Sequence, residues 1–175
     1  DTPYACTCPS CTAIGNTEKN ATPAVTELIL RLSQRFPRHF FFTTSYLTTQ
    51  QVTDKQLPPN AGVIVSAINF PLRRIDGKDA KEKAFAGQLE QWKNVTKNIY
   101  IWDYINNFDD YLTPMPILKI ARQRLQFFKQ HGASGIFFNG IGYSYSSFDE
   151  MRTFVLSALL INPELSVDNL TASFF

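Results

Sequence analysis

The chain has 175 residues, 44% of them hydrophobic and 18% charged, so it has room for one ordinary domain with a sizeable core. The net charge is +2 and no basic run is interleaved with aromatic residues, which argues against nucleic acid as a partner. No apolar stretch approaches the roughly 18 residues that a membrane span needs, and a chain that begins at Asp1 could not show a signal peptide.

The first 21 residues are rich in Cys, Thr, Asn and Pro and are predicted to form a loop. The loop carries a CxCxxC motif made of Cys6, Cys8 and Cys11. Three thiolates can bind one Zn²⁺ ion that takes a fourth ligand from elsewhere, as a structural metal site. A disulfide from Cys11 to Cys6 or to Cys8 with one free thiol, and plain packing, are the alternatives. None of these interpretations is catalytic, and no other cofactor is required.

The first half of the chain then predicts one helix followed by two strands. Residues 22–36 carry an apolar stripe at helical spacing, with Thr22 as the expected cap. Residues 39–47 (HFFFTTSYL) are an aromatic and β-branched run of strand length. After a proline-containing connector, residues 61–70 (AGVIVSAINF) are expected to form a buried strand.

The second half alternates helices and strands. Helices are predicted at about 81–95, 113–132 and 147–163, the last one opened by a capping box from Ser147 to Glu150. Strands are predicted at 98–104 (NIYIWDY) and 133–140 (ASGIFFNG).

Strands that are apolar on both faces and separated by helices predict an α/β fold with a parallel sheet. Four strands are too few to close a barrel, and neither a GxGxxG motif after the first strand nor a P-loop is present. We therefore expect residues 1–163 to form the C-terminal half of a (β/α)8 barrel whose N-terminal half lies outside this chain. Residues 164–175 are expected to start a following helical segment.

Barrel enzymes place their chemistry where the strands end, which directs the search for a site. Trp102, Asp103 and Tyr104 end one predicted strand, and alternation sends Asp103 to the face opposite the two aromatic residues. A strand-end aspartate beside aromatic rings can act as a general acid or base or can hold sugar hydroxyls. Alternatively, it can simply cap a loop amide or pair with an arginine. Other candidates for substrate binding at strand ends and in the loops beyond are Tyr46, Asn69, Arg73, Asn107, Asn139 and Tyr143.

The stretch GIFFNGIGYSYSS predicts a tight turn between the last strand and its helix. Gly135, Gly140 and Gly142, followed by serines at a helix start, are compatible with phosphate binding, although glycines also simply permit such a turn. Tyr143 and Tyr145 are better suited to stacking on a sugar or to binding its hydroxyls.

Several stretches together resemble a known family: the opening D…CTCPSC, the run IYIWDYINNFDDYLTPMPIL, the FPL at 70–72 and the close GASGIFFNG…FDEMRTFVLSALLINPEL. They are similar to an uncharacterised bacterial family of glycosidase-like (β/α)8 barrels, a domain of unknown function related in fold to α-glucuronidases. The resemblance covers nearly the whole chain. It implies a carbohydrate-active barrel that is secreted, periplasmic or at the cell surface, with no established substrate.

The family's aspartate before the cysteine loop corresponds to Asp1, and its WDY corresponds to 102–104. Two departures stand out. A family pattern like GxFEQG has become GIFFNG, with Phe138 and Asn139 in place of the acid and the amide, and Phe70 replaces a histidine that commonly precedes Pro-Leu.

Two function hypotheses follow. The first is a glycoside hydrolase that acts on a carbohydrate, such as a uronic-acid-containing glycan, with Asp1 and Asp103 as the two carboxyl groups that such hydrolysis normally needs. The alternative is a non-catalytic carbohydrate-binding protein on a degraded glycosidase scaffold, which the departures at 138–139 favour. In either case the expected partners are a carbohydrate and the remainder of the same polypeptide.

Overall fold

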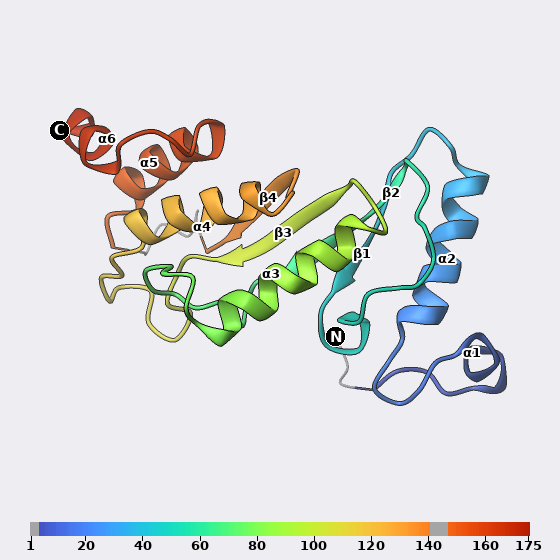
Figure 1. Ribbon diagram of the computed structural model, residues 1–175. Helices are drawn as coiled ribbons and strands as arrows, with labels where there is room; N and C mark the ends of the chain where they lie inside the picture. Colours follow the sequence, from blue (N-terminus) through green and yellow to red (C-terminus); the bar gives the residue numbers. More distant parts are fainter. Residues whose placement is uncertain (1–3, 141–146) are drawn as a thin grey trace.

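A parallel four-stranded sheet forms the centre of the computed structural model, which describes residues 4–140 and 147–175 (Figure 1). The spatial order of the strands follows the chain, β1-β2-β3-β4, and every neighbouring pair is parallel. The prediction of an α/β fold with a parallel sheet is therefore confirmed. The strands are β1 (Phe41–Ser45), β2 (Ala61–Ser66), β3 (Ile99–Tyr104) and β4 (Gly135–Asn139).

The helices and strands follow the predicted order, including the two successive strands β1 and β2 with no α-helix between them. The predicted helices are α2 (Thr22–Arg35), α3 (Ala80–Lys93), α4 (Leu118–Gln130), α5 (Asp149–Ile161) and α6 (Val167–Phe174). Two short elements were not predicted, α1 (Pro9–Ile14) and the 3₁₀-helix η1 (Leu47–Thr49). None of the helices in the described part of the chain is long and apolar enough to cross a membrane.

Two predicted helix caps are wrong. Thr22 is the first residue of α2 rather than its cap, and its hydroxyl donates instead to the carbonyl of Gln51 at 3.1 Å. Ser147 does not cap α5, since its hydroxyl donates to the carbonyl of Leu112 and the helix begins two residues later. In both places a nearby loop carbonyl competes successfully for the hydroxyl.

Two predicted elements are shorter in the structure. The helix expected from residue 113 begins at Leu118, because Pro114 and Pro116 disfavour helical geometry in the residues before them. The strand expected over 61–70 ends at Ser66, where the chain turns and the amide of Phe70 donates to the carbonyl of Ala67 at 2.9 Å.

One face of the sheet is covered by helices and holds the core. Because paired residues of parallel strands point to the same side, the register places alternate residues of β2, β3 and β4 on this face. One core cluster joins the β2 and β3 side chains to α3 and α4, and a second joins β4 to α4 and α5. The strand residues that supply these clusters are Val63, Val65, Ile99, Ile101, Ile136 and Phe138.

The opposite face of the sheet is lined with aromatic side chains. Both core clusters take their strand residues from the helix-covered face, so this second face contributes none. Its side chains remain partly or largely accessible: Tyr100 is 40% and Phe137 58% exposed. We call it the open face, and it consists of Phe42, Thr44, Gly62, Ile64, Ser66, Tyr100, Trp102, Tyr104, Gly135, Phe137 and Asn139.

Two glycines make room for the rings at the amino-terminal end of the open face. A Cβ added at Gly62 would lie 2.6 Å from the Phe42 ring, and one added at Gly135 would lie 2.6 Å from the Tyr100 ring. The Phe42 and Tyr100 rings meet edge to face, with centroids 5.1 Å apart, although their strands are separated by β2. The glycines therefore allow an aromatic contact to span three strands.

Candidate functional site

The carboxyl ends of β2, β3 and β4 bring together several predicted site residues on the open face. Ser66 lies in register with Trp102, which lies in register with Phe137. One step further along the strands, Tyr104 lies beside Asn139. Three of these positions were predicted from the sequence as substrate-binding residues, and the structure places Trp102, Tyr104 and Asn139 next to one another.

The aromatic rings at this end form a connected group. Trp102 and Tyr104 are nearly parallel, with an interplanar angle of 16° and centroids 6.4 Å apart. Phe137 meets the Trp102 ring edge-on at 5.8 Å, and Phe108 in the loop beyond β3 meets Tyr104 edge-on at the same distance. The result is an aromatic surface that runs from the sheet into the loop beyond β3.

Two buried polar atoms on this surface lack a partner. Within the described residues, neither the Trp102 Nε1–H nor the Ser66 hydroxyl oxygen makes a hydrogen bond, although both atoms are shielded from solvent. A buried polar group without a hydrogen bond costs about 1–3 kcal/mol. Because the two residues are in register on adjacent strands, the two unpartnered groups lie on neighbouring strands of the open face.

Asp103 points the other way, into the helix-covered side. Its side chain is fully buried and forms a bidentate ion pair with Arg124 of α4, which is also buried. The amide of Tyr104 donates to the same carboxylate at 2.8 Å. The geometry favours the structural interpretation, an aspartate paired with an arginine, over an acid or base that faces a substrate.

The third guanidinium nitrogen of Arg124 donates hydrogen bonds to the loop beyond β2. Its Nη1 donates to the carbonyls of Pro71 at 2.6 Å and Phe70 at 3.3 Å. Its guanidinium lies 4.6 Å from the centroid of the Phe70 ring. The departure noted at Phe70 is therefore a packing residue here: its ring covers the guanidinium that holds Asp103.

Arg73, one of the candidates for substrate binding, already has an acidic partner. It forms an ion pair with Asp79, the cap of α3. That hydrogen bond to Asp79 raises the pKa of Arg73, and the same contact, helped by the amide of Lys81, lowers the pKa of Asp79. Arg73 would have to exchange this partner to bind a ligand.

Three further candidates lie in loops that follow the carboxyl ends of the strands. Tyr46 is half-buried, and its carbonyl accepts from the amide of Thr49 in η1. Asn107 is half-buried, and its side-chain oxygen accepts from the amide of Asp109 at 3.1 Å. Asn69 is exposed and lines a surface hollow between the loop after η1 and α3. Asp1, Tyr143 and Gly142 lie outside the described residues.

A second buried arginine at the strand ends escaped the sequence analysis. Arg152 of α5 donates to the side-chain oxygen of Asn106 at 2.7 Å and to the carbonyl of Ile105 at 2.5 Å. Desolvation lowers the pKa of Arg152. A charged residue in the middle of an apolar helical stripe was the available signal, since such a residue is buried only when it has partners.

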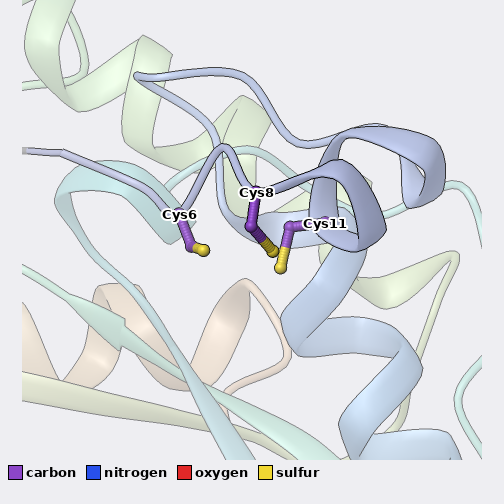
Figure 2. Close-up of side chains that lie close together, drawn as sticks. All are labelled: Cys6, Cys8 and Cys11. Carbon is purple, nitrogen blue, oxygen red and sulfur yellow. The ribbon is translucent and has the colours of Figure 1, made fainter.

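The three cysteines gather at the start of α1. Their sulfur atoms all lie within 4.8 Å of one another, and Figure 2 shows the three side chains turned toward a common point. Cys6 and Cys8 are exposed and Cys11 is half-buried. The backbone N–H of Cys11 and hydrogen bonds with the other two thiols lower the pKa of Cys8, whereas contact with Cys8 and then Cys6 raises the pKa of Cys11 to about 11.

Comparison with known protein families matches residues 1–175 to a family described as "Domain of unknown function (DUF4838)". The chain belongs to this family. Searches of curated proteins and of solved structures each found no match.

The family match confirms one part of the resemblance and leaves the other as a prediction. Membership in a domain family of unknown function is confirmed over the whole length. The link to glycosidases and the barrel remains an expectation. The geometry of the sheet names the residues at which this expectation can be tested.

Proposed function

We propose that this chain forms the glycan-binding face of a carbohydrate-active protein, with sugar rings stacked on the aromatic group at the carboxyl end of the open face. The observation that carries the proposal is the pair of unpartnered polar atoms, Trp102 Nε1 and Ser66 Oγ, set among accessible aromatic rings in the described part of the chain.

The proposal follows from the chemistry of sugars. A pyranose ring has an apolar face of C–H groups and an edge of hydroxyls, so its binding site needs both a flat apolar surface and hydrogen-bonding groups. Trp102 and Tyr104 supply nearly parallel rings. The Ser66 hydroxyl and the indole N–H can then pair with sugar hydroxyls, which would remove the cost of leaving them unsatisfied. The Asn139 side chain lies beside Tyr104 in the next row.

We further propose that the sheet is half of a (β/α)8 barrel. Strands in chain order, all parallel, with their core on a single face, are the arrangement found along the wall of such a barrel. In that arrangement the open face becomes the barrel interior. The Phe42 and Tyr100 end would be packed by further strands, and the Trp102 end would open toward the substrate.

Between the two function hypotheses, the geometry favours binding by this chain over catalysis by it. Hydrolysis of a glycosidic bond normally needs two carboxyl groups that face the substrate. Asp103 faces away from the open face and is held by Arg124. A hydrolase built on this scaffold would therefore need its carboxylates from other positions, of which Asp1 lies outside the described residues.

Binding can be tested with the tryptophans as reporters. The chain has two, Trp92, which is 1% exposed in the core, and Trp102, which is half-buried on the open face. In a Trp92→Phe background, the remaining indole emission should change as uronic-acid-containing or neutral oligosaccharides are titrated, and Kd should be confirmed by calorimetry. Trp102→Ala should weaken binding about tenfold or more, equivalent to roughly 1.4 kcal/mol.

The control is Phe154→Ala, which removes a 43% exposed aromatic residue from α5, away from the sheet. The proposed site would be refuted if Trp102→Ala left binding unchanged. It would also be refuted if neither the uronic-acid-containing nor the neutral oligosaccharides bound to the parent. Turnover of aryl-glycosides that Asp103→Asn abolishes while the urea midpoint stays unchanged would instead favour the catalytic hypothesis.

A further inference from the structure

The N-terminal segment of residues 4–18 is folded without a core of its own. Its only buried residue is Asn16, and the short helix α1 has no fully buried residue. The side chain of Asn16 links the segment to α2. Its Nδ2 donates to the carbonyl of Cys6 at 3.1 Å, and its Oδ1 accepts from the backbone N–H of Ala24 at 3.0 Å. Small folds with so little apolar burial commonly have a cross-link or a metal ion in place of a core.

The available cross-linking groups are the three thiols, which converge on one point. Two sulfur atoms bound to one Zn²⁺ at about 2.3 Å, in tetrahedral geometry, lie about 3.8 Å apart. The observed limit of 4.8 Å means that a contraction of about 1 Å at most brings all three sulfurs onto one ion. The backbone already holds them there: the Asn16 amide N–H donates to the Cys11 carbonyl, and the Thr12 amide donates to that of Cys8.

A disulfide accounts for this geometry less well. It would join two of the sulfurs and leave the third without a function, whereas all three are close to one another (Figure 2). Three convergent thiols are a set of soft ligands, which select Zn²⁺ and similar thiophilic ions over Mg²⁺ or Ca²⁺.

We propose that Cys6, Cys8 and Cys11 bind one Zn²⁺ ion through three thiolates, and that this ion holds the segment 4–18 in place against the start of α2. Binding replaces the thiol protons, which pass to solvent, so zinc affinity rises with pH. In the described residues the group supplies three donor atoms, and because it lies at the surface, the fourth position is open to a ligand from elsewhere. This site is independent of the proposed glycan-binding face.

The test uses the whole chain, reduced and stripped of metal, titrated with Zn²⁺ against a chromogenic chelator. We expect one ion per chain. With Co²⁺ as the probe, thiolate-to-metal charge-transfer absorption should appear in the near ultraviolet with the same stoichiometry. Cys8→Ser should weaken zinc binding by more than the roughly 10- to 100-fold that loss of an outer hydrogen-bond partner costs. The matched control is Ser10→Ala, an exposed neighbour of Cys11 in α1, which should bind as the parent does.

A second readout reports on the segment itself. Zn²⁺ should slow protease cleavage within residues 4–18 at least tenfold in the parent and leave Cys8→Ser unprotected, while the urea midpoint of the sheet stays the same in both. Three thiols that react freely in the metal-free chain support the site. Failure to bind zinc stoichiometrically, or a single reactive thiol after aerobic purification of the parent, which would indicate a disulfide, overturns the proposal. Should Cys8→Ser fail to fold, the cobalt spectrum of the parent decides alone.

Discussion

Neighbouring residues of β3 have opposite surroundings. On the helix-covered side, Ile101 and Asp103 are completely buried, and the one charge among them has two hydrogen bonds from Arg124. On the open side, Trp102 and Tyr104 remain half-buried, and the indole N–H finds no partner within the described residues. On the helix-covered side of this strand the buried polar side chain has hydrogen-bond partners, whereas on the open side the indole N–H has none among the described residues.

The contrast separates stability from binding along a single strand. A polar group that is buried and fully paired holds neighbouring elements together, whereas one that is buried and unpaired costs free energy until something binds it. We therefore expect substitutions on the helix-covered side to change the free energy of unfolding, and substitutions at the carboxyl end of the open side to change ligand affinity.

The largest effect is expected from Arg124→Met. It leaves the Asp103 carboxylate buried without a counter-charge and removes the donor to the carbonyls of Phe70 and Pro71. Breaking a buried pair from one side typically costs about 3–5 kcal/mol, so urea denaturation should show a loss of that size.

The control for this experiment is Arg73→Met, which breaks an arginine–aspartate pair whose arginine side chain is 54% exposed. It should change stability much less, because water screens the exposed pair. The double variant Asp103→Leu/Arg124→Met should recover most of the lost stability, since apolar replacement of a whole buried pair is often neutral. Equal effects of the two single arginine variants would contradict the assignment of Asp103 to a structural pair.

A smaller loss is expected from removing an aliphatic side chain on the helix-covered side. Ile101→Ala opens a cavity in the first core cluster and should cost about 3 kcal/mol, within the range for isoleucine-to-alanine changes in cores. Ile64→Ala, on the open side of β2, should cost about 1 kcal/mol, because that side chain is only half-buried. Thermal unfolding of the two variants gives the comparison, and a larger loss at Ile64 would mean that the open face is packed in solution.

The glycines beneath the aromatic rings offer an intermediate test. A Cβ at Gly62 would lie 2.3 Å from the backbone oxygen of Asn98 and 2.6 Å from the Phe42 ring. Gly62→Ala should therefore destabilise the sheet by about 1–3 kcal/mol through overpacking. Gly87→Ala on α3 should do the opposite and stabilise by roughly 0.5–1 kcal/mol, because nothing lies within 4 Å and alanine favours the helix. Urea midpoints of the two variants that shift in the same direction would contradict this account.

The sequence was sufficient to predict the parallel sheet, because its strands are continuous apolar runs separated by amphipathic stripes that a helix places on one side. Alternation along β3 was also enough to assign Asp103 and Trp102 to opposite faces. The sequence did not reveal which face the helices cover, and that decides the role of each residue. The partner of Asp103 lies 21 residues further along the chain, on a helix whose stripe does not identify one arginine among its basic residues.

Local hydrogen bonds set a second limit. Thr22 and Ser147 have the residue types and spacing of helix caps, yet their hydroxyls donate to carbonyls 29 and 35 residues away in the chain. Propensity ranks caps by local geometry alone, so it cannot anticipate a loop that folds back to the same position. The convergence of the three thiols could be predicted from the sequence, because the CxCxxC spacing keeps the three residues close together in the chain.

The smallest expected effect concerns the ion pair between Arg73 and Asp79, the cap of α3. The hydrogen bond from Arg73 lowers the pKa of Asp79 below its ordinary value near 4, so the folded chain releases this proton more readily than the unfolded chain. The pair therefore stabilises the fold above about pH 4 and loses its effect as the pH falls through the lowered pKa of Asp79.

Asp79→Asn removes the charge but keeps an oxygen to cap α3 through the amide of Lys81. The urea midpoints of parent and variant should consequently differ slightly near pH 6 and converge at strongly acidic pH. The difference near pH 6 should also shrink at high salt, because the pair is partly exposed to solvent. An equal gap that persists at low pH would show that the difference does not come from the charge of Asp79. The charge of this exposed pair would then contribute nothing measurable, in contrast to the buried pair that holds Asp103.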